Sequence, residues 1–338
     1  MQGRLYRSFG DDLKERFGCR VWKVTVAAGF TCPNRDGGRG RGGCIYCNNE
    51  GFNPNLRQRL ESIHEQVEKG MDLLSKKKRA SKFIIYFQPY TNTYASVEDL
   101  KNIYDSSLIS DDIVGISIGT RPDCVPEEVL DLLESYTGKY MIWLEIGLQS
   151  MHDRTLNLIN RGHDLATFID AIIRAKRRRT ILLATHIIHG LPGENHEEMM
   201  DTVRLVSALG FDGIKFHNLH VMRNTVLERM YREGKVSLLT MEEYVSLVAD
   251  SLEILPPQTA ILRLSGDAPD DILVAPSWCR RKLEIREMIN AELKKRRTSQ
   301  GARYDEKALS MFLEKAMGAL RSRPRESRTC IAKAALPL

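Results

Sequence analysis

Short runs of apolar and β-branched residues alternate along the chain with longer stretches in which apolar residues recur at helical spacing. The short runs predict strands at 21–28, 82–87, 113–118, 140–148, 182–190, 212–220 and, more weakly patterned, 260–264. The amphipathic stretches predict helices near 58–75, 96–108, 126–135, 164–178, 195–209 and 240–255. Such alternation is typical of βαβ units with a parallel sheet. We therefore expect an α/β fold, a partial (βα)6-type barrel over residues 21–278.

Two segments flank this predicted barrel. Residues 1–20 form an N-terminal segment, and residues 279–338 form a C-terminal extension with helical patterns at Leu283–Arg297 and Glu306–Leu320. The extension is basic: residues 291–338 hold twelve Lys and Arg against five Asp and Glu, whereas the whole chain has a net charge of +6. A basic tail on a nearly neutral body can bind a polyanion such as RNA, or can serve only as a solvated tail.

Two further basic runs, 76–79 and 176–179, each end a predicted helix just before a strand. Cations at a helix C-terminus complement the helix dipole, which is a sufficient structural reason for them. In a βα barrel these connections lie on the face away from the active site. We therefore do not expect these runs to contact substrate.

No apolar run approaches the roughly 20 residues that a membrane-spanning helix needs, and the first residues lack a signal peptide's apolar segment. We expect a cytoplasmic protein without membrane contact. Seven cysteines, an odd number at irregular spacing, do not indicate a disulfide framework. Four of them are scattered and are expected to be small buried apolar residues: Cys19, Cys124, Cys279 and Cys330.

The remaining three cysteines, Cys32, Cys44 and Cys47, lie in a loop that follows the first predicted strand and holds five glycines between its first two cysteines. Three thiolates on a [4Fe–4S] cluster leave one iron open, and that iron can bind a small molecule. The glycines allow the backbone to fold tightly around such a cluster. A structural zinc site is the alternative, but zinc favours four protein ligands, and only one C-x2-C pair is present; His64 could supply a fourth ligand.

Several motifs in a fixed order resemble the radical S-adenosylmethionine (SAM) superfamily. The resemblance is to the branch of the Elongator catalytic subunit and the oxygen-independent coproporphyrinogen oxidases, and to a related bacterial family. It extends from about Lys23 to about Trp278 and rests on the cysteine loop, 86–94, 119–123, 145–150, 160–163, 186–194 and 263–269.

The resemblance implies a [4Fe–4S] cluster that chelates SAM and, when reduced by a donor such as flavodoxin or ferredoxin, cleaves it to a radical that abstracts hydrogen from a substrate. It also implies roles for single residues. Tyr46 resembles the residue packed near the adenine of SAM. Gln149 and Arg161 match a pair that holds the ribose and carboxylate of SAM, in keeping with amide and guanidinium chemistry. His186 stands where related enzymes carry a ribose-binding Asp.

The sequence also departs from the superfamily's pattern. The cysteine spacing is x11 then x2 rather than x3 then x2, and the usual Gly-Gly-Glu after the second strand is replaced by residues 88–90, with Gln88 as the candidate substitute. Asn224 and Ala27 also stand where other residue types are usual. Gln149 and His186 have an alternative role as ordinary core residues.

Polar residues that directly follow predicted strands are candidates for contact with substrate, because a barrel gathers its reactive groups there. The candidates for catalysis are Tyr90, Asp123, His217 and His220. Further candidates on the substrate side are Asn92, Tyr94, Arg121 and Asp267. Asp267 has an alternative role as the structural partner of Arg263.

Three functions of different classes fit these observations. The first is a radical SAM enzyme that modifies a tRNA wobble uridine, favoured by the Elongator resemblance and the basic extension. The second is a radical SAM enzyme that acts on a small metabolite or a tetrapyrrole, favoured by the nearly neutral body. The third is a non-enzymatic, metal-bearing protein that binds nucleic acid, which would leave the Gln149 and Arg161 match without a role.

Overall fold

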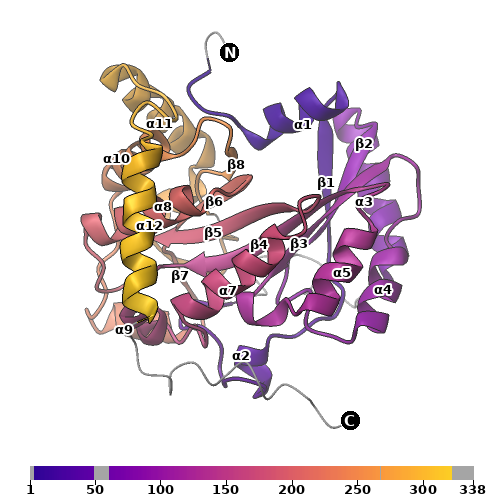
Figure 1. Cartoon of the computed structure of the whole chain (residues 1–338), viewed down its shortest axis with the longest axis horizontal. Coiled ribbons are helices and arrows are strands. Elements are labelled where there is room, and N and C mark those ends of the chain that lie inside the picture. The colour runs from indigo at the N-terminus through magenta and orange to yellow at the C-terminus, as the bar shows by residue number, and fades with distance from the viewer. Residues whose placement is uncertain (1–3, 49–60, 267, 322–338) are drawn as a thin grey trace.

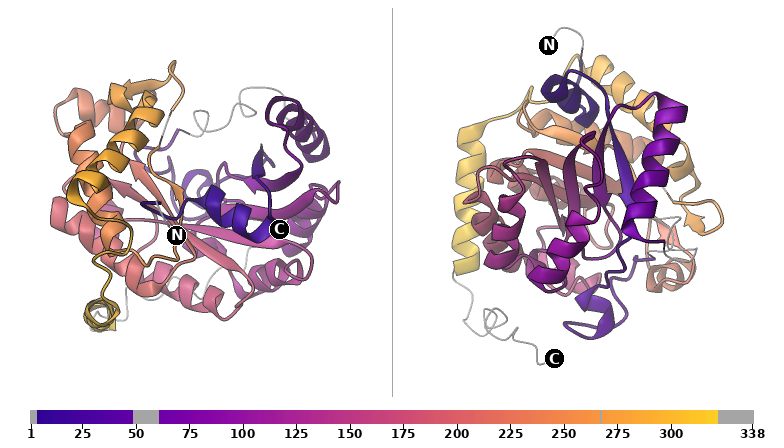
Figure 2. Two further views of the ribbon diagram at one scale, coloured as in Figure 1. Left: turned by 90° about the horizontal axis from the view of Figure 1, so that it is seen from above. Right: turned by 90° about the vertical axis from the view of Figure 1, so that its right-hand side faces the viewer.

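A seven-stranded parallel sheet forms the centre of the computed structural model, which describes residues 4–48, 61–266 and 268–321. The sheet curls into a half-barrel (Figures 1 and 2). Its strands stand in chain order: β1 (Val21–Val26), β2 (Lys82–Phe87), β3 (Ile113–Thr120), β4 (Met141–Gln149), β5 (Leu182–His189), β6 (Gly213–Asn218) and β8 (Ala260–Arg263). Six strand–helix units and a seventh strand confirm the predicted α/β fold, including the weakly patterned strand at 260–264.

Helices cover the outer face of the sheet (Figure 2). They are α3 (Ile63–Lys78), α4 (Val97–Asp105), α5 (Glu127–Ser135), α7 (Leu165–Lys176), α8 (His196–Leu209) and α10 (Met241–Ile254). Most begin at a side chain that accepts a hydrogen bond from the first turn, as Ser62, Asn195 and Thr240 do in complete capping boxes. The large core between helices and sheet buries the outward residues of the strands, each contributing about 1.5–3 kcal/mol.

The inward positions of β4 show how the inside of the half-barrel changes from one end to the other. Trp143, nearest the start of the strand, packs in an apolar cluster with Ala184 and Ala260. Glu145, Gly147 and Gln149 follow at every second position, because strand side chains alternate between faces. The interior is therefore apolar where the strands begin and polar where they end.

The N-terminal segment contains a helix that the sequence pattern did not predict, α1 (Phe9–Phe17). Ser8 caps its first turn, and the Phe9 ring packs edge-on against Trp143 with 5.4 Å between ring centroids. α1 thereby covers the apolar end of the half-barrel, at the top of Figure 1.

Several short elements were also not predicted. Most follow the ends of strands: α2 (Pro33–Asp36), α6 (Asp153–Leu158), α9 (Val226–Arg232), and the two-stranded antiparallel pair β7 (Val221–Met222) and β9 (Leu273–Ala275). Single 3-10 turns occupy Pro122–Cys124 and Ser277–Arg280. Elements of two to seven residues carry too few positions to show a helical or strand period.

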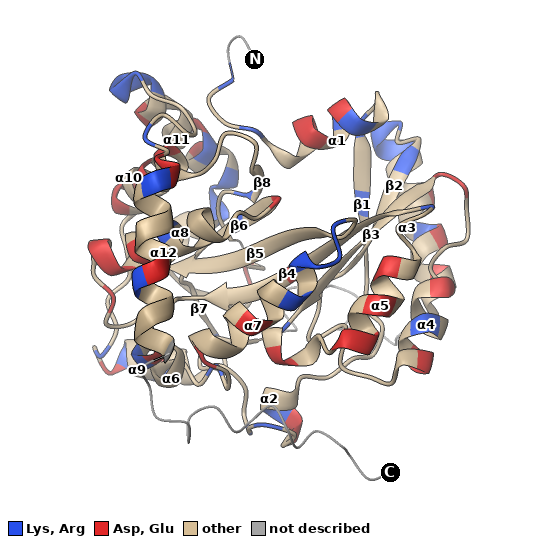
Figure 3. Cartoon of the chain, in the orientation of Figure 1, with Lys and Arg blue, Asp and Glu red and all other residues tan. Residues whose placement is uncertain are grey.

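The C-terminal extension is helical as expected, with α11 (Lys282–Arg296) packed against α10 and α12 (Glu306–Arg321) packed against α8 (Figure 1). The basic end of α11 and that of α3 both lie at the end of the half-barrel where the strands begin, opposite α2 (Figure 3). Residues 322–338 of the basic tail fall outside the described residues.

Within the described ranges, no helix combines the length and the apolar character that crossing a membrane requires.

Candidate active site

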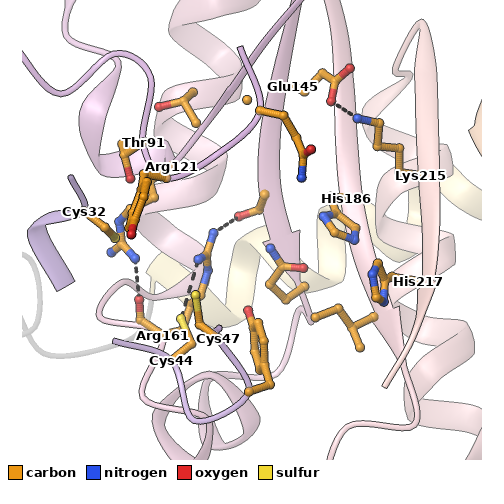
Figure 4. Close-up of a pocket in the computed structure, with 18 of the residues that line it drawn as sticks. Cys32, Cys44, Cys47, Thr91, Arg121, Glu145, Arg161, His186, Lys215 and His217 are labelled. Atoms are coloured by element: carbon orange, nitrogen blue, oxygen red, sulfur yellow. Dashed lines mark hydrogen bonds and ion pairs between the residues drawn. The ribbon is translucent and has the colours of Figure 1, made fainter. Parts of the chain in front are cut away.

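A pocket opens where the strands of the half-barrel end. It extends from the three cysteines of the cysteine loop, residues 32–47, to charged side chains inside the sheet (Figure 4). The pocket is lined by most of the residues that the sequence predicts to bind a cofactor or substrate: Cys32, Cys44, Cys47, Tyr46, Gln88, Tyr90, Arg121, Gln149, Arg161, His186, His217 and His220. Residues separated by more than 180 positions therefore contribute to one site.

The cysteine loop is fixed to the segment that follows β4. Asn34 Nδ2 donates a hydrogen bond to the Asn160 carbonyl at 2.6 Å, and Asn160 Nδ2 donates to the Gly43 carbonyl at 2.8 Å. The Ile45 N–H donates to the Ile159 carbonyl at 3.0 Å. Gly43 has a φ of +77°, a conformation that glycine adopts without strain. These bonds place Cys44 and Cys47 beside Arg161.

Three nitrogen donors point at the cysteine sulfurs. Asn34 Nδ2 and Arg161 Nη1 each lie 3.7 Å from Cys44 Sγ, and Arg35 Nη1 lies 3.7 Å from Cys47 Sγ. Such donors stabilise the thiolate form that a metal group requires. The arrangement fits a [4Fe–4S] cluster, whose three cysteines each bind a different iron.

The same cysteines do not form a single-ion site. A zinc ion draws its ligands to about 2.0–2.3 Å from one point. Between residues 4 and 321, with 49–60 and 267 left aside, no three His, Cys, Asp or Glu side chains are grouped so as to hold one ion.

Buried polar atoms in the pocket lack a protein partner. In the described part of the chain, Gln149 Oε1, Arg161 Nε and His186 Nε2 have no hydrogen-bond partner. Buried polar groups are nearly always paired, so these atoms fit a polar ligand. Gln149 is also strained, with a φ of +76° where the pairing of β4 with β5 shifts register. Strain of this kind gathers at functional sites.

The inner end of the pocket holds a buried ion pair between Lys215 on β6 and Glu145 on β4 (Figure 4). Glu145 also accepts hydrogen bonds from Lys23 at 3.1 Å, Ser117 at 2.7 Å and Tyr86 at 3.1 Å. Although burial acts against it, the Lys215 and Lys23 ammonium groups hold the pKa of Glu145 well below its usual range. Burial lowers the pKa of Lys215, and the positive charges of Lys23 and Arg263 lower it further. The Glu145 carboxylate raises it but does not offset them, so the pKa is about 7.

Three imidazole rings line the pocket next to this pair. The rings of His186 and His217 have their centroids 5.2 Å apart, and those of His217 and His220 are 4.7 Å apart. Burial and the cations Arg263 and Lys215 lower the pKa of His186 well below its usual value. Burial and the neighbouring rings do the same to His217. Both imidazoles are therefore neutral near pH 7 and can donate and accept hydrogen bonds.

Some of the expected substrate-side residues lie behind the pocket wall. The Asp123 carboxylate is buried and is held by Arg121 at 2.9 and 3.0 Å and by Arg39 at 3.1 Å. Asn92 donates to the Gly119 carbonyl at 2.9 Å, and the hydroxyl of Tyr94 lies against Gly38 of the cysteine loop. Asp267 falls outside the described residues, so neither its candidate role toward substrate nor its alternative role as the partner of Arg263 can be compared with the structure.

Two of the four cysteines outside the cysteine loop are buried. Cys124 and Cys279 are buried as expected. Cys19 is only half-buried, and Cys330 lies outside the described residues.

Tyr86, Glu145 and Lys215 line the inner end of the pocket, and no role was expected for them from the sequence. A signal for two of them was present. Glu145 stands in an otherwise apolar run, and Lys215 stands between Ile214 and Phe216 in a predicted strand, where an unpaired charge would be costly. Each of these two charges could have been expected to have a buried partner, but the sequence does not say which residue that partner is.

Comparison with known proteins matches both parts of the chain. Residues 34–206 match the Radical SAM superfamily, and residues 211–295 match the Radical SAM C-terminal domain. YtqA of Bacillus subtilis is 40% identical over 298 residues, which are 88% of this chain and 92% of YtqA. The tRNA uridine(34) acetyltransferase of Dehalococcoides mccartyi is 28% identical over 178 residues, 52% of this chain and 37% of that protein.

Among solved structures, the archaeal Elp3 of Methanocaldococcus infernus superposes with a TM-score of 0.64 and 17% identity, over 83% of this chain and 64% of that one. At this identity the likeness shows a shared fold. The family match covers residues 34–206 and YtqA aligns over nearly its whole length. The chain therefore belongs to the radical SAM superfamily, a superfamily of enzymes.

Proposed function

We propose that this protein binds a [4Fe–4S] cluster through Cys32, Cys44 and Cys47, cleaves SAM reductively, and modifies the wobble uridine of a tRNA. The observation that carries the first two parts is that the three cysteines line the same pocket as Gln149 and Arg161. The bound cofactors supply one-electron cleavage of SAM and abstraction of hydrogen from the substrate. The electron comes from a small donor such as flavodoxin or ferredoxin.

The chain's own residues orient SAM and keep water from it. The unpartnered Gln149 Oε1 accepts a hydrogen bond from a ribose hydroxyl, and His186 Nε2 bonds the ribose from β5. The Arg161 guanidinium, already 3.7 Å from Cys44 Sγ, pairs with the carboxylate of SAM. Gln88, half-buried after β2, bonds the amino group. Tyr46, which packs on the apolar cluster around Ile188, covers the adenine.

A tRNA uridine is supported as substrate by the likeness to the tRNA uridine(34) acetyltransferase over 52% of this chain. A tRNA substrate places the reaction in the cytoplasm. The basic end of α11 lies at the far end of the half-barrel from α2 (Figure 3). Exposed arginines nearer the cysteines are better placed to meet RNA phosphates: Arg35, Arg41 and Arg223, the last beside Asn48.

The test is an anaerobic reaction of the reconstituted full chain with SAM, dithionite and total tRNA from cells that lack the gene. Digested tRNA is then compared by mass spectrometry before and after the reaction, with the Cys44→Ala variant as control. We expect one uridine-derived nucleoside to change mass only with the active protein. If SAM is cleaved but every nucleoside stays unchanged, a small metabolite or tetrapyrrole becomes the substrate. If SAM stays intact, the binding-protein alternative replaces the proposal.

A further inference from the structure

The inner end of the pocket carries more positive than negative charge. Lys23 and Lys215 both pair with the single carboxylate of Glu145. Arg263, at the end of β8, also lines the pocket and forms no ion pair with any residue of the described ranges. With the imidazoles of His186 and His217 neutral, three cations face one anion at this place among the residues that the structure describes.

The two pocket-lining cations stand side by side. Lys215 on β6 and Arg263 on β8 are register partners in the parallel sheet. Like charges opposite one another on neighbouring strands destabilise a sheet, and the penalty grows when water is excluded. The Lys215 side chain is only 7% exposed, so solvent screens it little. An anion between the two side chains would remove this repulsion.

We propose that Lys215 and Arg263 bind an oxyanion of the substrate, a carboxylate or a phosphate, at the inner end of the pocket. Arg263 supplies a planar fork of N–H donors, and Lys215 supplies a point charge whose position Glu145 and Tyr86 fix. The proposal rests on the proposed function only in taking this pocket as the substrate's. It adds that the substrate carries an acidic group.

These cations lie away from the cysteines and from Arg161, the group assigned to the carboxylate of SAM, although His186, which is assigned to the ribose, is the register partner of Lys215. Figure 4 shows Cys44, Cys47 and Arg161 at one end of the pocket and Lys215 with Glu145 at the other. The carboxylate of SAM is expected at the cysteine end, where it reaches the open iron. An oxyanion at Lys215 and Arg263 therefore belongs to a second molecule, or to a part of the substrate far from the cluster.

The charge state of Lys215 gives the site a pH dependence that supports the assignment. Among the described residues, the groups that face its ammonium are Glu145 on β4, Tyr86 on β2, Lys23 on β1, His186 on β5 and Arg263 on β8. An added anion raises the pKa of Lys215 from about 7 and draws a proton onto it. Binding should therefore be tighter at pH 6.5 than at pH 8.5.

The test measures ligand binding and needs neither SAM cleavage nor RNA. The anaerobically reconstituted full chain is melted with increasing sodium acetate or sodium phosphate, with ionic strength held constant by chloride. We expect a saturable rise in Tm with at least one of the two anions. Acetate alone indicates a substrate carboxylate, phosphate alone indicates a nucleotide phosphate, and both together indicate an oxyanion site without discrimination.

Variants of Lys215 and Arg263 test whether these two side chains bind the anion that raises the Tm. Arg263→Gln and Lys215→Met should raise the half-saturating anion concentration about tenfold or more, since each removes a charged hydrogen-bond donor. Arg232→Gln, an exposed arginine on α9, is the matched control and should change nothing. Should Arg263→Gln fail to fold, Arg263→Lys keeps the charge and should bind the anion more weakly than the natural chain.

Three results would overturn the inference: no saturable rise with either anion, a rise that both variants retain, or competition by SAM, which would assign the anion site to the cofactor. Because RNA is absent, a failure here leaves the tRNA proposal intact. Unchanged tRNA nucleosides, conversely, leave the anion site intact.

Discussion

Arg121 holds the buried carboxylate of Asp123 with two hydrogen bonds, 2.9 and 3.0 Å long, from two nitrogens of its guanidinium. The third nitrogen of the same group donates to the Arg161 carbonyl at 2.8 Å. Arg39 of the cysteine loop reaches the same carboxylate at 3.1 Å. Asp123 therefore connects the turn after β3, the cysteine loop and the backbone of Arg161. We propose from these contacts that Asp123 is a positioning residue rather than a group that contacts substrate.

Asp123→Asn should accordingly impair the cysteine end of the pocket. Removing the charge leaves the buried guanidinium group of Arg121 without its counter-ion, a loss of about 3–5 kcal/mol for a buried pair. We expect less iron retained per chain after reconstitution, a changed electron paramagnetic resonance spectrum of the reduced protein, and weaker SAM binding. Asp111→Asn, at an almost fully exposed side chain, is the control. An Asp123→Asn protein with the natural spectrum and SAM affinity, but slow turnover, would assign Asp123 to catalysis instead.

Gln149→Ala should weaken SAM binding while leaving the cluster in place. The variant removes the unpartnered Oε1 at the end of β4 without touching a cysteine or the Arg161 contact with Cys44. Loss of one or two hydrogen bonds corresponds to about a tenfold rise in the SAM dissociation constant. Equilibrium dialysis with iron analysis measures both quantities, with the exposed Gln258→Ala as control. Unchanged SAM affinity would return Gln149 to the role of a core residue.

The stability of the protein should rise with pH between about 7.5 and 9 through Lys215. Its pKa is about 7 in the folded chain and about 10.5 in the unfolded one, so in this window the unfolded chain binds the additional proton. Stability rises with pH wherever the unfolded state binds more protons, by up to about 1.4 kcal/mol per pH unit for one group. Urea unfolding at several pH values should show that the free energy of unfolding rises less steeply with pH in Lys215→Met than in the natural chain. Equal slopes in both proteins would show that Lys215 stays charged.

RNA binding should depend on the arginines near the cysteines. Arg41→Gln and Arg223→Gln each remove an exposed cation on the α2 side of the molecule. Each lost phosphate contact should lower tRNA affinity several-fold. It should also reduce, by about one, the slope of the logarithm of the binding constant against the logarithm of the salt concentration. Lys294→Gln and Lys295→Gln, at the basic end of α11, are the matched controls. Larger losses in the α11 variants than in the arginine variants would place the RNA on the C-terminal extension.

The alternation of apolar runs with amphipathic stretches was sufficient to predict the sheet and its covering helices. The signal is strong because a parallel strand is buried on both faces and must be apolar over its length. Elements such as α1 and the β7–β9 pair escaped prediction because their stability comes from contacts distant in sequence. The Phe9 ring, for example, packs against Trp143.

The residues of the pocket were predictable to the extent that they follow strands or carry a motif. The cysteines, Gln149, Arg161 and His186 come together in one pocket as expected from their order. Which polar residue lines the pocket and which lies behind its wall could not be predicted, because that depends on partners such as Arg39 for Asp123. The ion pair of Glu145 with Lys215 likewise depends on the curl of the sheet, which brings β4 and β6 together across the inside of the half-barrel.

Anaerobic reconstitution followed by incubation with SAM and dithionite tests whether the three cysteines hold a cluster that cleaves SAM. The natural chain and the Cys19→Ala variant, whose half-buried cysteine lies outside the cysteine loop, should each bind about four irons and four sulfides and form 5′-deoxyadenosine. Cys44→Ala should lose both the bound iron and the product. A chain that holds one zinc ion, or that forms no 5′-deoxyadenosine with a complete cluster in place, would contradict the account.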